Sequence, residues 1–397
     1  MALCGCVAQE HGEKLLKRMK LLDLVVGPDC YHLIPGLLQE SRRVALTEQG
    51  GEDYEGFQPV REEFPRAFVN VIRGCDNFCT YCIVPHVRGR ERSRPRRAVL
   101  SEIESLADAG FREITLLGQN VNSYRNEDVG FPELLRKASE AVGERCRLRF
   151  VTSNPRDLTT ELVSVMASAD NICNQFHLPA QSGSDRVLRA MNRGYTRKGY
   201  IEKVNMLREA MPDIVLSTDM IAGFPGETPE EFEESVTLLE EIRFDYAFLF
   251  RYSERQGTAA VDITPRVPVK ERLRRLNELQ ELQMEITLAR SRELTGSVRT
   301  VLVTGPARMP GQLAARTAGN RMVILESTDH APGDMIEVRI TRPTATHTSE
   351  NLSFPYLGKH SLHRFISSGK PLPQNAYKGR SPLHQFLEVV HRAVVPA

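Results

Sequence analysis

Residues 68–82 read FVNVIRGCDNFCTYC, an apolar segment that runs directly into three closely spaced cysteines. Valine, isoleucine and phenylalanine before Gly74 are typical of a buried β-strand, and the glycine marks its end. Cys75, Cys79 and Cys82 therefore follow the carboxyl end of a strand. What these thiols do depends on the architecture around them.

Apolar strands alternate with amphipathic helices from this stretch onward. SRPRRAVLSEIESLADAG (93–110), for example, predicts a helix with Pro95 near its start and Gly110 just past its end. Similar helical patterns separate six predicted strands, at 68–74, 113–118, 147–153, 175–180, 214–223 and 246–253. Near-continuous Val, Ile, Leu and Phe runs are expected of parallel strands covered on both faces. The fold class is α/β, and the simplest architecture is a partial (β/α)6 barrel.

The length of 397 residues predicts two or three domains at roughly 150 residues each. Residues 1–57 are expected to hold a remnant α/β domain, with a helix at 10–23 and a strand at 24–27, and a linker. The barrel takes 64–295 and includes a long helix over 268–294. Four short strands at 296–345 predict a small β-barrel domain, and 346–397 has no assignment. The apolar stripe expected on the long helix is Leu273, Leu276, Leu279, Leu282, Ile286 and Leu294.

The composition is that of a globular chain. Apolar residues at 41% and charged residues at 26% exclude wholesale disorder, and no apolar window is long enough for a membrane span. Lys plus Arg at 52 nearly balances Asp plus Glu at 51, but HVRGRERSRPRRA (86–98) carries six arginines against one glutamate. Such a run is either a phosphate-binding surface or a solvated loop.

Eight cysteines in a chain of this length are too few for a disulfide framework. Three within eight residues instead indicate a metal site in a reducing compartment, and we expect a cytoplasmic location. Three thiolates at these spacings suit a four-iron cluster with one iron left open. Structural zinc, with His86 as a weak fourth ligand, and unrelated buried thiols are the alternatives.

The spacing CxxxCxxC after the first barrel strand resembles the radical S-adenosylmethionine (radical SAM) superfamily. Further segments resemble its methylthiotransferase family, most closely the branch that modifies N6-isopentenyladenosine beside the anticodon of tRNA. The stretch GQNVNSY (118–124) carries that closer likeness. The segments are 71–95, 116–124, 176–196, 217–232 and 248–260, and the likeness extends over roughly residues 1–345.

This resemblance implies a 4Fe–4S cluster held by Cys75, Cys79 and Cys82, with S-adenosylmethionine on the open iron. One electron from an external donor would cleave the sulfonium and release a 5′-deoxyadenosyl radical. The β-domain at 296–345 is similar to a TRAM domain, which binds tRNA in this family. Its arginines suit backbone contact, namely Arg299, Arg308, Arg316, Arg321, Arg339 and Arg342.

Four further residues are candidate cofactor contacts. Tyr81 lies between two cluster cysteines and is placed to pack on adenine. Gly223, in GFPGE, lies either beside the adenine or only in a turn that caps a helix. Gln119 either contacts a ligand or satisfies loop backbone groups. Gln181 follows the fourth strand, where ribose and methionine contacts are plausible.

The family carries a second 4Fe–4S cluster on three N-terminal cysteines. Cys6 matches the third, whereas the first two would lie upstream of Met1. Hence the chain is expected to be a fragment of a longer protein, and the alternative is a natural chain that lacks sulfur insertion.

Three functions follow from the resemblance. The first is methylthiolation of isopentenyladenosine in tRNA, by a monomer with tRNA as its partner and no membrane. The second keeps the chemistry but acts on threonylcarbamoyl adenosine or a ribosomal-protein aspartate, which LLGQNVNSY (116–124) argues against. The third is a tRNA-binding remnant without turnover.

Overall fold

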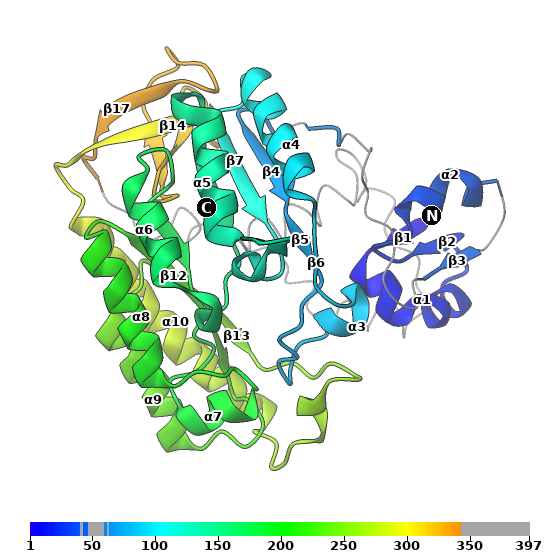
Figure 1. Ribbon diagram of the computed structural model, residues 1–397. Coiled ribbons are helices and arrows are strands. Elements are labelled where there is room, and N and C mark those ends of the chain that lie inside the picture. Colours follow the sequence, from blue (N-terminus) through cyan, green and yellow to red (C-terminus); the bar gives the residue numbers. More distant parts are fainter. Residues whose placement is uncertain (40–42, 47–58, 62, 343–397) are drawn as a thin grey trace. The chain divides into compact units, whose positions relative to one another are not determined.

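The computed structural model describes residues 1–39, 43–46, 59–61 and 63–342 (Figure 1). They form two compact units, one from within Met1–Phe57 and Val84–Gly89, the other from within Gln58–Ile83 and Arg90–Thr346. Most of the predicted linker and the tail at 346–397 lie outside the described residues.

The larger unit contains the predicted six-stranded parallel arrangement. Strands β4, β7 and β10 form one ladder in the order β10-β7-β4, and β11, β12 and β13 form another in that order. A parallel bridge between Leu148 and Ile172 links the two ladders. The partial barrel is thus confirmed, and in the described residues β4 and β13 are its unpaired edges. The strands are β4 (Arg66–Asn70), β7 (Glu113–Leu117), β10 (Arg147–Val151), β11 (Gln175–His177), β12 (Val215–Ala222) and β13 (Tyr246–Arg251).

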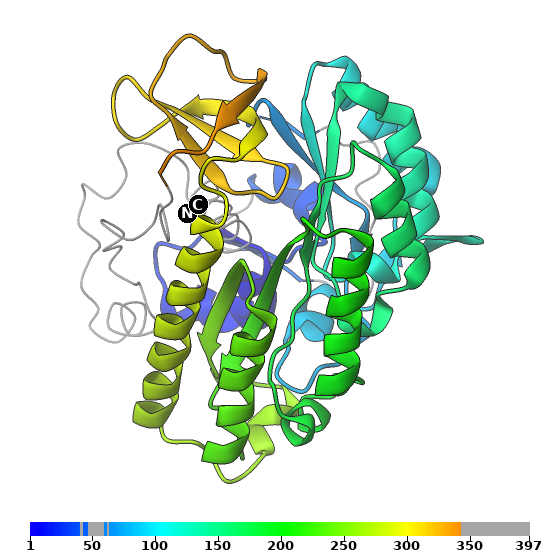
Figure 2. The same ribbon diagram turned by 90° about the vertical axis from the view of Figure 1, so that its left-hand side faces the viewer.

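Helices cover the outer side of these strands, as Figures 1 and 2 show. They are α4 (Arg96–Asp108), α5 (Phe131–Val142), α6 (Thr160–Ser168), α8 (Arg197–Ala210), α9 (Pro229–Ile242) and α10 (Val269–Arg292). The short helix α7 (Asp185–Ala190) lies beyond the ends of the strands (Figure 1). The sequence TPEE begins α9 with a capping box, in which Glu231 N–H donates to Thr228 Oγ1 at 3.3 Å and Thr228 N–H to Glu231 Oε2 at 2.8 Å. These bonds satisfy backbone donors that a helix start otherwise leaves free.

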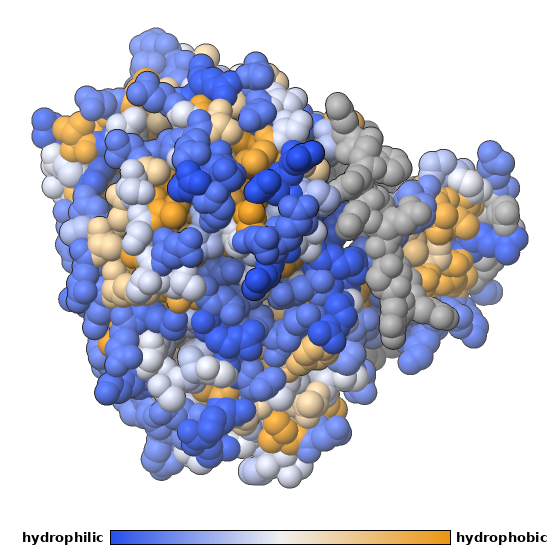
Figure 3. Space-filling view, viewed as in Figure 1, coloured by the Kyte–Doolittle hydropathy of each residue, from blue (hydrophilic) through white to orange (hydrophobic). Residues whose placement is uncertain are grey.

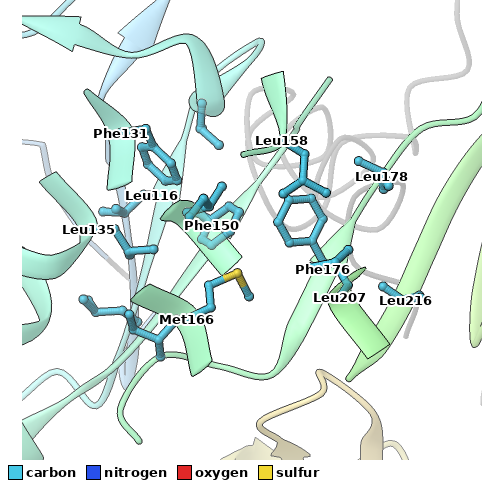
Figure 4. Packing of buried hydrophobic residues seen from close by; sticks show 14 of the residues in the cluster. Leu116, Phe131, Leu135, Phe150, Leu158, Met166, Phe176, Leu178, Leu207 and Leu216 are labelled. Carbon is cyan, nitrogen blue, oxygen red and sulfur yellow. The ribbon is translucent and has the colours of Figure 1, made fainter. Parts of the chain in front are cut away.

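The core lies between the strands and these helices (Figure 4). Phe150 of β10 is central to it, with Phe131 of α5 at 5.0 Å and Phe176 of β11 at 5.4 Å between ring centroids, both edge to face. Burying each such ring contributes about 1.5–3 kcal/mol. The core holds the sheet rigidly, so that the loops at its ends keep fixed positions.

The inner side of the strands is charged at its amino end. Glu113 of β7 is 2% exposed, and its Oε2 lies 2.7 Å from Arg147 Nε and 3.0 Å from Arg149 Nη2, both on β10. Burial alone would raise the pKa of Glu113, but the guanidinium groups of Arg149 and Arg147 hold it well below its usual range. Side chains alternate between the two faces of a strand. In β7, Ile114 and Leu116 pack in the core between the strands and the helices, so Glu113 lies on the opposite, inner face.

Four antiparallel strands follow the barrel, as predicted. They are β14 (Val298–Pro306), β15 (Leu313–Thr317), β16 (Met322–Leu325) and β17 (Met335–Arg339), in the order β16-β15-β14-β17. Val301, Val303 and Ala315 are its buried centre. This β-domain packs against the amino ends of the barrel strands, where Arg147 Nη2 donates to Arg316 O at 3.0 Å.

Helix α10 matches the predicted long helix, but one residue of the expected stripe is wrong. Leu273 is 46% exposed, whereas Arg272 and Arg275 are 6% and 3% exposed. The arginines are buried because acceptors lie beneath them: Arg272 Nε donates to Val267 O at 2.7 Å, and Arg275 Nη1 to Glu227 Oε2 at 2.7 Å.

The smaller unit is a three-stranded parallel sheet with helices. Strand β2 (Leu24–Val26) was predicted from its apolar run LVV. Strands β1 (Ala2–Cys4) and β3 (Arg43–Ala45), which pair with it on either side, were missed because ALC and RVA have no such run of branched apolar residues. Helix α1 begins at Cys6 rather than at residue 10, and α3 (Val84–Arg88) belongs to the same unit.

No helix in the described part of the chain is long and apolar enough to cross a membrane. On the face of the barrel unit seen in Figure 3, hydrophobic residues are scattered among hydrophilic ones.

Candidate functional site

The three cysteines lie on one loop beyond the carboxyl end of β4, after the short strand β5 (Ile72–Arg73). Cys75, Cys79 and Cys82 are all half-buried. The loop turns sharply, with φ of 75° at Gly74 and 46° at Phe78. A loop at this edge of a parallel barrel is where such folds build their active sites.

Hydrogen-bond donors point at two of the sulfurs. Asn77 Nδ2 lies 3.3 Å from Cys75 Sγ, and Arg193 Nη1 lies 3.3 Å from Cys79 Sγ. Burial raises the pKa of the Cys75 thiol, and the hydrogen bonds from Asn77 act in the opposite direction. N–H donors of this kind stabilise the thiolate form that binds metal.

No three His, Cys, Asp or Glu side chains among the described residues converge on a point where one metal ion would sit. A four-iron cluster does not require such convergence, because each thiolate binds a different iron. Three half-buried thiols on one loop, two of them with N–H donors, are a donor set that fits this cluster.

A short segment at the end of α7 holds the cysteine loop. Thr80 N–H donates to Met191 O at 3.1 Å and Thr80 Oγ1 to Ala190 O at 2.8 Å. Asn192 Nδ2 lies 3.2 Å from Asn77 O and 3.1 Å from Phe78 O. The sequence predicted only a helix for this segment, because no local pattern indicates its contact with the cysteine loop, which lies more than a hundred residues away in the chain.

Gln119 holds the start of the same loop. Its Oε1 accepts a hydrogen bond from the buried Gly74 N–H at 2.8 Å. Of the two predicted roles, the structure shows this backbone contact, and a ligand contact stays a prediction. Asn122, also in GQNVNSY, has a buried Nδ2 without a hydrogen-bond partner in the described residues.

Tyr81 is packed beside the segment that contains Gly223. It lies against a buried cluster formed by Val187, Met191, Phe224, Tyr252 and Ala260. Burial raises the pKa of Tyr81 well above its ordinary value, so the phenol stays neutral. The structure thus joins the end of β12 to the cysteine loop, whereas stacking on adenine stays a prediction.

Gly223 is required by the backbone. Its φ is +71°, and a Cβ there would lie 2.5 Å from Arg272 Cγ. Its N–H donates to Glu227 Oε2 at 2.7 Å, and the same oxygen accepts from Arg275 Nη1 at 2.7 Å. Helix α10 therefore fixes the turn that follows β12. An adenine contact at Gly223 stays a prediction.

Gln181 extends the pairing between β11 and β12. The backbone N–H of Gln181 donates to Asp219 O at 2.8 Å, and its backbone O accepts from Ile221 N–H at 2.9 Å. The φ of Gln181 is +68°. Within the barrel, His177 Nδ1 lies 3.0 Å from Ser217 Oγ. His177 is thus satisfied within the fold. The cofactor contact of Gln181 stays a prediction.

Cys6 is the first residue of α1, and Arg88 Nε of α3 lies 3.2 Å from its Sγ. Both residues belong to the smaller unit. The role of Cys6 as a ligand of a second cluster stays a prediction.

The arginine-rich run is only partly free for RNA. Arg94 Nη1 lies 2.7 Å from Glu102 and 2.8 Å from Asn70 O, and Arg90 Nε lies 2.7 Å from Asp76. Arg97, by contrast, is exposed, with no ion pair in the described residues.

The β-domain likewise uses several arginines to dock onto the barrel. Arg299 Nη1 lies 3.3 Å from Asp213, Arg321 pairs with Asp245, and Arg316 is buried. Burial lowers the pKa of Arg316 to about 10. Arg308, in the exposed turn between β14 and β15, is left for a partner.

Comparison with known proteins gives two domain matches. The radical SAM superfamily matches residues 69–239, and the TRAM domain matches residues 292–346. A tRNA-2-methylthio-N(6)-dimethylallyladenosine synthase of Prosthecochloris aestuarii is 43% identical over 352 residues, 87% of this chain and 80% of the relative. The synthase of the same name from Chlorobium chlorochromatii is 44% identical over 356 residues, 87% and 79% of the two chains.

Proposed function

Because the chain belongs to the family of tRNA-2-methylthio-N(6)-dimethylallyladenosine synthases, we propose that it is a radical SAM methylthiotransferase acting on N6-isopentenyladenosine in tRNA. The observation that carries this proposal is the cysteine loop at the carboxyl edge of a partial parallel barrel, with N–H donors on two sulfurs. The radical SAM and TRAM matches cover the two parts that this activity needs.

Cys75, Cys79 and Cys82 would hold the 4Fe–4S cluster, which supplies one electron for reductive cleavage of the sulfonium of S-adenosylmethionine. The protein residues have three tasks. Asn77 and Arg193 donate to the ligand sulfurs, Gln119 and Asn192 hold the loop, and Thr80 ties it to the end of α7.

The TRAM domain supports tRNA as the partner, with Arg308 as an exposed contact. We further propose a cytoplasmic location, a monomer and an external electron donor. Single-stranded loops allow a base to be splayed out, so the anticodon loop is the part of tRNA that can reach the cysteines.

The test is mass spectrometry of tRNA nucleosides from a strain lacking the gene, complemented with the wild-type gene or with the same gene carrying Cys79→Ala. The proposal expects 2-methylthio-isopentenyladenosine with the wild-type gene and only isopentenyladenosine with the variant. A Cys146→Ala control should restore the product, because Cys146 is buried and donates to Phe111 O at 2.7 Å, away from the loop.

Two outcomes would contradict the proposal. Methylthio product on threonylcarbamoyl adenosine or on a ribosomal protein would identify a sister activity. Salt-sensitive tRNA binding with no methylthio product from any nucleoside would identify a non-catalytic binding protein.

A further inference from the structure

Arg193 is a buried cation beside the cysteine loop. It is 6% exposed and follows α7 within the barrel unit. Its three nitrogens have different partners: Nε lies 2.9 Å from Tyr195 Oη, Nη2 lies 3.2 Å from Pro179 O, and Nη1 lies 3.3 Å from Cys79 Sγ. The guanidinium also lies 5.3 Å from the centre of the Tyr195 ring. This geometry fixes its orientation toward the sulfur.

No carboxylate accompanies this charge within 4.0 Å in the described residues. Two other buried arginines of the unit differ in this respect, since Arg149 pairs with Glu113 and Arg275 pairs with Glu227. A buried guanidinium with only neutral partners is costly, because desolvation is not offset by an opposite charge. The sulfur of Cys79 is the one contact of Arg193 that becomes anionic when it binds metal.

We propose that Arg193 is a positioning residue that sets the reduction potential of the cluster through the Cys79 sulfur. Its positive charge and its N–H donor stabilise the reduced, more negative cluster over the oxidised one, and so raise the potential. The inference rests on the proposed cluster at Cys75, Cys79 and Cys82. It goes beyond that function by assigning the electronic tuning to a residue outside the cysteine motif.

A purely structural role is the competing explanation. Arg193 also ties Tyr195 and Pro179 to the loop, so its removal is expected to lower stability in either case. A structural role alone leaves the potential of an assembled cluster unchanged. The potential therefore separates the two explanations.

The experiment uses the full chain, reconstituted anaerobically with iron and sulfide, without S-adenosylmethionine or tRNA. Redox titration followed by electron paramagnetic resonance gives the midpoint potential of wild type, Arg193→Met, Arg193→Gln and Arg193→Lys. Arg189→Met is the matched control, because it removes the same positive charge as Arg193→Met but from an exposed position on α7. Iron per chain and the melting temperature are measured on each sample.

The expected result is a fall of tenfold or more in the equilibrium constant for reduction in Arg193→Met and Arg193→Gln, about 59 mV for one electron. The midpoint potential should shift less in Arg193→Lys, and in Arg189→Met it should equal that of wild type. If Arg193→Met does not fold, the Gln and Lys variants decide the question. Unchanged midpoints in iron-loaded variants would overturn the inference alone, whereas an iron-free wild-type protein would overturn the proposed function as well.

Discussion

Gln119 accepts a 2.8 Å hydrogen bond from the N–H of Gly74, the residue directly before Cys75. The end of one barrel strand thus fixes the start of the cysteine loop that follows another. Gly74 is buried and has a φ of 75°, so no water replaces Gln119 without rearrangement of the turn.

Replacing Gln119 by Ala should therefore weaken the loop. A buried N–H left unpaired costs about 1–3 kcal/mol, and we expect faster loss of iron to a chelator together with a lower melting temperature. Gln119→Glu keeps an acceptor in the same place and should retain iron better than the Ala variant. Equal rates of iron loss in wild type and Gln119→Ala would show that this bond does not hold the loop.

The buried Glu113 should control stability at neutral and at low pH. Glu113→Gln leaves Arg147 and Arg149 without their shared carboxylate, and we expect a loss of about 3–5 kcal/mol in urea unfolding at pH 7. Because the pKa of Glu113 is lowered in the fold, its stabilising contribution is complete above the unfolded-state pKa of about 4.3 and declines as pH falls below it.

The difference in the free energy of unfolding between wild type and Glu113→Gln should thus shrink below about pH 4. Glu104→Gln, an exposed change on α4, serves as the control and should cost less than about 0.5 kcal/mol. A Glu113→Gln variant as stable as this control at pH 7 would contradict the ion-pair argument.

The turn after β12 should not tolerate a side chain at Gly223. Gly223→Ala meets two penalties, a left-handed backbone worth about 1–2 kcal/mol and a Cβ placed 2.5 Å from Arg272 Cγ. Gly110→Ala isolates the first penalty, because Gly110 has φ +88° but open space around its missing Cβ. Chemical denaturation should show Gly223→Ala losing clearly more stability than Gly110→Ala. Similar losses would mean that Arg272 moves aside easily.

Arg308 should contribute to tRNA binding without supporting the fold. If it neutralises one phosphate, Arg308→Ala should reduce the slope of log affinity against log salt by about 0.7–0.9, with the melting temperature unchanged. Arg316→Ala should show the reverse, a lower melting temperature with little change in slope, because Arg316 is buried and its Nη1 donates to Asn320 Oδ1 at 3.0 Å. Binding measured across a salt series checks both variants.

The regular part of the fold could be predicted because it repeats. Val, Ile, Leu and Phe runs separated by amphipathic helices predicted all six barrel strands. The smaller unit was predicted less well, since β1 (ALC) and β3 (RVA) lack the branched apolar run that identified β2 and lie outside any repeating pattern. Leu273 was placed in the core and Arg272 outside it, because helical periodicity ignores the acceptors that a neighbouring loop supplies.

The cysteine motif and the family resemblance were visible in the sequence by themselves, because ligand spacing along one loop is local information. The residues that support those cysteines were not, since Gln119 meets Gly74 and Arg193 meets Cys79 only after strands far apart in the chain have paired. Tertiary structure also decided which arginines are free for RNA, because an arginine that already contacts a buried carboxylate or a backbone carbonyl has its partner within the fold. Sequence records which groups are present, and only packing determines which of them meet, because burial turns a weak solvated attraction into a specific contact.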